Sequence, residues 1–183
     1  MRLGASRCAG VVAACVLACA CATTPDHSIY SAGGRSSYAG GRIEEPAKPL
    51  QCVPFARAES GVNLVGDAWT WWDLAAGRYQ RSNEPKLGSV LLLTGYAGPH
   101  RGHVAVVRAI DSSRQIRVDH ANWLDDGRIY RDDPVVDVSR DNDWSEVRVW
   151  NLRDNTLGAR IYPVRGFIGP DRDEATDRVA SRD

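Results

Sequence analysis

The chain of 183 residues carries 23 basic and 23 acidic side chains, so its formal net charge at pH 7 is zero. Only two of the basic residues are lysines, and no block of positive charge stands out along the chain. Proteins that bind nucleic acid present a basic patch or stripe to the phosphate backbone. The composition therefore argues against nucleic acid as a partner.

The first 21 residues, MRLGASRCAGVVAACVLACAC, have the pattern of an export signal. Arg2 and Arg7 supply the positive charge that precedes a signal-peptide core. Residues 8–18 form the apolar run, which is too short to span a membrane as a helix. We therefore predict a signal peptide over residues 1–21.

The end of this run resembles the lipobox of bacterial lipoproteins in the sequence VLAC, residues 16–19, with ACAC, residues 18–21, as a poorer second frame. The resemblance implies cleavage before Cys19 or Cys21, lipidation of that thiol and a membrane anchor. The alanine after either cysteine resembles the outer-membrane default of Gram-negative lipoproteins. An ordinary secretory signal with incidental cysteines is the alternative, and both alternatives place the protein in the cell envelope or outside the cell.

Composition divides the rest of the chain into three parts. Residues 22–48 contain glycine and serine pairs and few large apolar side chains, which predicts a flexible tether. Residues 171–183 are nearly all charged or small, which predicts a disordered tail. Residues 49–170 between them are long enough to form one compact domain with a single core.

Two helices are predicted at the start of this domain. Residues 51–59 hold several apolar side chains before Gly61, a residue type that often ends helices. Residues 66–76 follow, with Asp67 as a candidate N-cap and Gly77 as the residue that ends the helix.

Strands are predicted to follow the helices as neighbours, with a hairpin turn at residues 111–113. Because no helix lies between the later strands, the pattern indicates an α+β fold with the N-terminal helices packed on an antiparallel sheet of about five strands. The predicted strands cover residues 89–94, 102–110, 115–123, 146–151 and 162–169.

Cys52 is the only cysteine of the predicted domain, so a disulfide framework is excluded there. Such a residue is either a buried apolar filler or a reactive thiol. Cys52 lies at the start of the first predicted helix, where unpaired N–H groups and the helix dipole favour negative charge and can lower a thiol pKa. A thiolate nucleophile also needs a base, and that base needs an orienting partner.

Two of the four histidines lie on neighbouring predicted strands. With the turn at 111–113, His103 faces His120 directly across the strand pair, with Cβ atoms about 5 Å apart. His103 is therefore the candidate base and His120 its orienting partner, although a purely structural pair of histidines is the alternative. Asp119 has the wrong strand parity to reach the same face.

Zinc is a competing interpretation of these side chains. His103, His120 and Asp119 are ligand types, but a third ligand on one face is missing unless Cys52 joins, and a catalytic zinc site needs three protein ligands. We therefore predict no metal and no other cofactor.

Three segments of the chain resemble, in order and spacing, the signature segments of the CHAP domain, the cysteine, histidine-dependent amidohydrolase and peptidase family. They read QCVPFAR, PKLGSVLLLTGYAGPHRGHVAVV and IRVDHANW, and the resemblance covers about residues 49–125. It implies a papain-like fold of the NlpC-related type, with Cys52 at a helix N-terminus and His103 on the sheet as catalytic residues. It also implies hydrolysis of amide or peptide bonds in peptidoglycan.

The chain departs from this family at one position. Many CHAP domains have glutamate where this chain has His120, followed two residues later by asparagine, here Asn122. The related NlpC-type enzymes use histidine as the third member, so either His120 or Asn122 could fill that place. The backbone N–H of Cys52 would stabilise an oxyanion, with help from Gln51.

The resulting hypothesis is a lipid-anchored, monomeric cysteine hydrolase of the cell envelope that acts on peptidoglycan. If the source is Gram-negative, the outer membrane or periplasm is the expected location. Two other functions fit the same residues. One is a non-catalytic lipoprotein that binds muropeptides or a partner enzyme, and the other is an amidohydrolase of a small amide. The bond that is cut, as by an amidase or an endopeptidase, is left open.

Tryptophans are frequent in so short a domain and are expected mainly in the core. Trp69 and Trp72 would share a buried helix face, and Trp144 and Trp150 would also be buried. Trp123 either packs in the core or stacks on a sugar ring.

Overall fold

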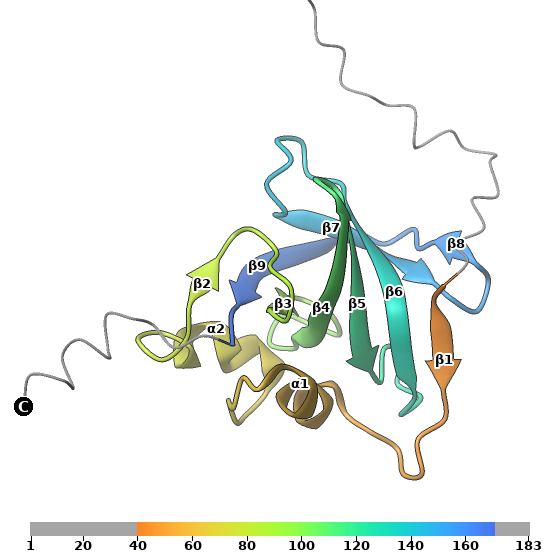
Figure 1. The fold of residues 1–183 in the computed structure, drawn as a ribbon, viewed down its shortest axis with the longest axis horizontal. Helices are drawn as coiled ribbons and strands as arrows, with labels where there is room; N and C mark the ends of the chain where they lie inside the picture. The colour runs from red at the N-terminus through yellow and green to blue at the C-terminus, as the bar shows by residue number, and fades with distance from the viewer. Residues whose placement is uncertain (1–39, 171–183) are drawn as a thin grey trace, which may run out of the picture. The chain divides into compact units, whose positions relative to one another are not determined.

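The computed structural model describes residues 40–170 of the chain (Figure 1). The predicted signal peptide, the lipidation site at Cys19 or Cys21 and the tail at 171–183 lie outside the described residues. Within the described residues, no helix is both long and apolar enough to cross a membrane. The last part of the segment predicted as a tether contains strand β1 (Arg42–Glu44), which pairs with β6.

Six antiparallel strands close into a barrel, because each pairs with the next and the last returns to the first (Figure 1). Three short strands extend it: β1 lies beside β6, β2 (Arg81–Ser82) beside β9, and β8 (Thr156–Leu157) beside β7. Closure leaves no free edge among the six main strands. These are, in order around the barrel, β3 (Val90–Leu93), β4 (His103–Ser112), β5 (Gln115–Ala121), β6 (Ile129–Asp137), β7 (Glu146–Asn151) and β9 (Tyr162–Ile168).

The predicted fold class, helices packed on an antiparallel sheet of about five strands, is wrong. The domain is mostly β, with a closed barrel and only short helices. The five predicted strands exist, but β6 was missed because its sequence, IYRDDPVVD, places two aspartates and Pro134 in its middle, and these residues are rare in central strands. Since β6 pairs with both β5 and β7, it converts an open sheet into a barrel.

A β-bulge allows β6 to carry these residues. The β5–β6 register shifts by one residue, and Asp132, the extra residue, has a left-handed φ of 50°. Its backbone N–H donates to Asp119 Oδ1 at 2.9 Å. Because the bulge adds one residue, Tyr130 and Asp133 face the same side as His120, although they are an odd number of residues apart.

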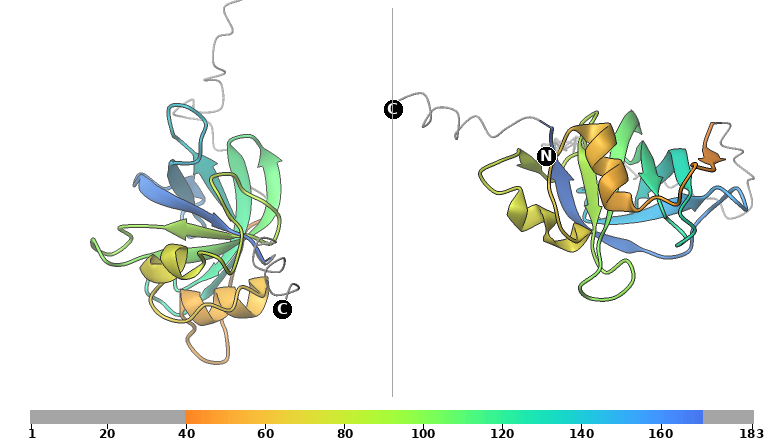
Figure 2. Two further views of the ribbon diagram at one scale, coloured as in Figure 1. Left: turned by 90° about the vertical axis from the view of Figure 1, so that its left-hand side faces the viewer. Right: turned by 90° about the horizontal axis from the view of Figure 1, so that it is seen from below.

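The helical segments lie on one side of the barrel, where α1 (Cys52–Ser60) packs against β4 and β5 (Figure 2). Its bounds confirm the first predicted helix to within one residue. The second predicted helix is shorter than expected: a 3-10 turn, η2 (Ala68–Thr70), precedes the single turn α2 (Trp71–Leu74). Asp67 caps η2 as predicted, because its carboxylate accepts from the backbone N–H of Trp69 at 3.4 Å.

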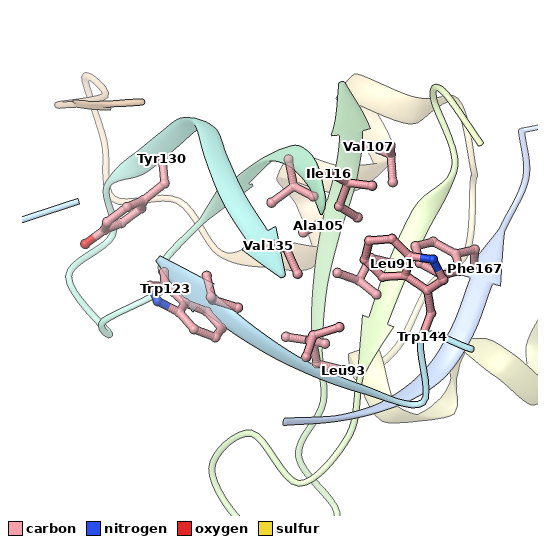
Figure 3. Close-up of a cluster of buried hydrophobic side chains, with 13 residues drawn as sticks. Leu91, Leu93, Ala105, Val107, Ile116, Trp123, Tyr130, Val135, Trp144 and Phe167 are labelled. Carbon is pink, nitrogen blue, oxygen red and sulfur yellow. The ribbon is translucent and has the colours of Figure 1, made fainter. Parts of the chain in front are cut away.

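Strand β3 and the first half of β4, residues 103–107, are buried on both faces. Leu91, Leu93, Ala105 and Val107 point into the barrel and pack with Phe167 (Figure 3). The alternate residues of both strands pack against the helical segments and complete a second cluster beneath them. These strands therefore read as continuous apolar runs without a polar alternation.

The tryptophans divide between core and surface. Trp144 and Trp150 are buried as predicted, but Trp69 is 42 % exposed, so its predicted place in the core is wrong. Trp71 is the fully buried tryptophan of that segment. The backbone of Trp69 nevertheless packs tightly, since a Cβ on Gly102 would lie 2.6 Å from its nitrogen. Gly102 thus allows η2 to lie directly against the start of β4.

Candidate active site

Cys52 is the first residue of α1, and Gln51 is the N-cap residue. The side chain of Cys52 is partly buried and packs against the cluster beneath the helices. The backbone of Val104, the residue after His103, interacts with the Cys52 thiol and favours its ionised form. The helix therefore brings Cys52 to the backbone at the start of β4, next in the chain to the predicted base.

The loop after β5 holds the segment that leads into α1. Asn122 donates from its side-chain amide to Gln51 Oε1 at 3.0 Å and accepts from the backbone N–H of Gly127 at 2.7 Å. The backbone N–H of Leu50 donates to the carbonyl oxygen of Gly127 at 2.9 Å. Asn122 thus fixes the residue before Cys52, and its side-chain hydrogen bonds do not include either imidazole.

His103 on β4 and His120 on β5 form a direct hydrogen bond. His103 Nε2 lies 2.9 Å from His120 Nδ1, and the two rings meet edge to face at 82°. Each side chain is 1 % exposed. The structure therefore brings together the two histidines that strand parity placed on one face, and His120, not Asn122, is the partner of His103.

The register predicted for this hairpin was wrong. Its turn lies at residues 113–114, since β4 and β5 pair Ser112 with Gln115 at its base. Further along, Val106 pairs with Asp119, which places His103 two residues away from direct opposition to His120. A shift of two residues keeps a side chain on the same face, so the imidazoles meet diagonally across the ladder.

Asp133 on β6 extends the pair into a chain of three side chains. Its Oδ2 lies 2.9 Å from His120 Nε2, and the residue is completely buried. Its other oxygen, Oδ1, has no hydrogen-bond partner. Sequence reasoning missed Asp133 together with β6. The apolar residues on either side of the two aspartates are the sequence signal that could have indicated a bulged strand here, and with it Asp133.

Aromatic side chains enclose the two imidazoles. The Trp123 ring centroid lies 4.9 Å from that of His103 and 5.2 Å from that of His120. Tyr96 covers His103 at 4.9 Å, and Tyr130 covers His120 at 5.3 Å. The hydroxyl of Tyr96 donates to the carbonyl oxygen of Trp123, so these two enclosing residues are hydrogen-bonded to each other. Trp123, only 5 % exposed, has a packing role and does not offer a free face to a sugar.

Burial sets the resting protonation state of Cys52 and His103. Burial raises the pKa of the Cys52 thiol above its ordinary value of 9.0, although backbone N–H groups oppose the shift. Burial, reinforced by the electrostatic interaction with the neighbouring His120 imidazole, lowers the pKa of His103 well below 6.5. At neutral pH the pair is therefore a thiol and a neutral imidazole. The expectation that the helix N-terminus lowers the thiol pKa does not hold here, because desolvation outweighs it.

Alkylation of Cys52 by iodoacetamide is expected to accelerate only as the pH rises through and beyond 9.0, because the raised pKa delays thiolate formation. The rate can be followed by mass spectrometry of the peptide that contains Cys52, with glutathione alkylated in parallel as the reference. Activated cysteines in other enzymes have pKa values of about 3.5–7.5. A rate plateau that begins in that range would contradict the buried-thiol geometry.

Asp119 lies on the opposite face from the imidazoles, as strand parity predicted. Its carboxylate forms 2.8 Å ion pairs with Arg108 and with Arg131. Glu59 of α1 also pairs with both arginines, so this cluster fastens the helix to the barrel. Among residues 40–170, no group of three or more histidine, cysteine or acidic side chains is arranged to hold a metal ion.

A family model described as the CHAP domain matches residues 43–122 of the chain. The matched segment contains Cys52, His103 and His120, whereas Asp133 lies beyond its end. No curated protein matches the chain. CHAP domains are typically hydrolases or peptidases, so the match suggests an amidase or peptidase function related to peptidoglycan.

Proposed function

We propose that the protein is a cysteine hydrolase of the cell envelope that cleaves amide or peptide bonds of peptidoglycan. Cys52 is the nucleophile, His103 is the base, and His120 orients His103. The observation that carries the proposal is the buried hydrogen bond between His103 and His120 beside the helix that begins at Cys52. The CHAP match supports the reaction class and the substrate.

The reaction begins from the neutral pair. His103 accepts the thiol proton while the sulfur of Cys52 attacks the carbonyl carbon, and a tetrahedral oxyanion forms. His103 then gives this proton to the leaving amine as the C–N bond breaks, which leaves a thioester on Cys52. A water molecule, deprotonated by His103, attacks the thioester carbon, so the carboxylic acid departs and the thiol is restored.

The N-terminus of α1 supplies the oxyanion site in this proposal. The backbone N–H of Cys52 lies at the helix N-terminus, where it has no helical acceptor, and it already favours negative charge on its own sulfur, so we assign it to the developing oxyanion. Gln51 contributes its side-chain NH2 group, because its Oε1 is already held by Asn122. Asn122 therefore acts by positioning Gln51.

The location in the cell envelope rests on the first 21 residues. Their charge, apolar run and cysteines support export, with Cys19 or Cys21 as the lipidated residue. We propose that the lipid anchor holds a monomeric domain close to its polymeric substrate.

Incubation of purified sacculi with the wild-type protein is expected to release fragments whose new termini identify the bond that is cut, as read by mass spectrometry. Cys52→Ala is expected to release none, because it removes the nucleophile. Sacculus binding by both proteins without any fragments would contradict the proposal and favour a muropeptide-binding role. Intact sacculi combined with hydrolysis of small amides would assign the site to a different substrate.

A further inference from the structure

We infer that Asp133 is a positioning residue that determines which nitrogen of His103 is free to take the proton of Cys52. The inference rests on the proposed function, because it concerns the same cysteine and histidine. It adds a fourth side chain, from a strand outside the segment that matches the CHAP family.

The geometry is a linear chain of three side chains from neighbouring strands. His103 Nε2 lies 2.9 Å from His120 Nδ1, and His120 Nε2 lies 2.9 Å from Asp133 Oδ2. Both nitrogens of His120 are therefore engaged. His103 uses Nε2 in this chain, so Nδ1 is the nitrogen that remains for the thiol.

An ionised carboxylate accepts hydrogen bonds and cannot donate them. With Asp133 ionised, His120 must carry its proton on Nε2, which leaves the Nδ1 of neutral His120 as an acceptor. His103 must then carry its proton on Nε2, and its Nδ1 is left without a proton. Without an obligatory acceptor at position 133 the whole chain can reverse, and Nδ1 of His103 would then carry a proton and could not act as a base.

The carboxylate also balances charge during the reaction. When His103 accepts the thiol proton, an imidazolium forms in a site closed by aromatic rings. Among the described residues, Asp133 is the carboxylate hydrogen-bonded to the histidine pair, since Asp119 is paired with two arginines. The surrounding Tyr96, Tyr130 and Tyr162 have raised pKa values because of burial, so they stay uncharged.

The buried position of the Asp133 carboxylate is energetically unfavourable, and side-chain packing does not explain why a carboxylate lies there. A buried carboxylate with one unpartnered oxygen destabilises the native state, and burial raises the pKa of Asp133. The bulge that aims it inward also holds Asp132 in the left-handed region, which is unfavourable for a non-glycine residue. Such features are retained where they serve a function, and the hydrogen bond to His120 identifies that function here.

Imidazole nitrogen-15 NMR of the full-length protein near neutral pH tests the inference directly. In the wild type, His103 and His120 are both expected to carry a proton on Nε2 and none on Nδ1. In Asp133→Asn, which conserves shape but can donate, the bare nitrogen of His103 is expected to move, wholly or in part, from Nδ1 to Nε2. Fragment release from sacculi is expected to fall by up to about 10⁴-fold, the loss seen when a triad aspartate becomes asparagine.

Asp119→Asn is the matched control, since it changes the adjacent carboxylate on the other face. It is expected to leave the tautomers of both histidines unchanged even if it weakens the fold. Backbone amide spectra establish that each variant is folded. If Asp133→Asn does not fold, the tautomers of His103 and His120 in the wild type are the test of the inference.

A bare Nε2 on His103, or a His120 protonated on both nitrogens, in the wild type would overturn the inference. An Asp133→Asn variant with unchanged tautomers and unchanged fragment release would do the same. Failure of the proposed function gives a different pattern: the wild type would leave sacculi intact while showing the expected tautomers, and the tautomers would still change in Asp133→Asn.

Discussion

Replacing His103 with alanine is expected to lower kcat/KM for sacculus hydrolysis by about 10²–10⁴-fold, the usual contribution of a positioned general acid–base group. The loss should be large because the raised pKa of the partly buried Cys52 thiol leaves little thiolate at neutral pH unless a base removes the proton. The initial rate of fragment release at low sacculus concentration reports this quantity. The rate is normalised to folded protein, since His103 is itself buried.

His100→Ala is the matched control for this substitution. His100 lies three residues earlier, in the loop that precedes β4, is exposed, and its ring centroid lies 5.3 Å from that of Trp69. Its removal is expected to leave the rate within about twofold of the wild type, as surface substitutions usually do. Equal losses in the two variants, or no loss in His103→Ala, would exclude His103 as the base.

Replacing Trp123 with alanine is expected to reduce the free energy of unfolding by about 3–5 kcal/mol, the usual effect of deleting a buried aromatic side chain. Trp123 packs against both imidazoles and against Tyr96 and Tyr162 at ring distances between 4.9 and 5.2 Å. Urea unfolding followed by circular dichroism measures the change.

The same variant is expected to raise the pKa of His103 toward 6.5, because burial is the main reason that this pKa is low. A histidine NMR titration measures that shift in the folded variant. Trp69→Ala provides the control, since its 42 % exposed ring should contribute less than about 0.5 kcal/mol. Similar destabilisation by the two substitutions, or an unchanged His103 pKa in Trp123→Ala, would contradict the enclosed site.

The central part of the site was predictable because it depends on local rules. A cysteine followed by a helical pattern gave the place of Cys52 at a helix N-terminus, and the structure agrees. The side on which His103 and His120 lie depends only on the two-residue period of a strand. That prediction survived an incorrect turn position, because the error was an even number of residues.

The closed barrel and the role of Asp133 were not predictable, because both depend on strand β6. Its central Asp-Asp-Pro sequence contradicts strand propensity, and only the bulge at Asp132 makes it compatible with the ladder. Without β6 the sheet stays open, and Asp133 has no strand to carry it. One unrecognised strand therefore accounts both for the wrong fold class and for the missing fourth side chain.

The protonated state of Cys52 would also protect the residue from oxidation in the proposed location outside the cytoplasm. Peroxides attack thiolates far more readily than thiols, and repeated oxidation leads to sulfinic and sulfonic acids that cannot be reduced again by ordinary thiols. Because burial raises the pKa of the Cys52 thiol, the resting protein offers little thiolate to such oxidants. The proposed nucleophile would thereby be preserved, although no second cysteine lies among residues 40–170 to reduce it once it is oxidised.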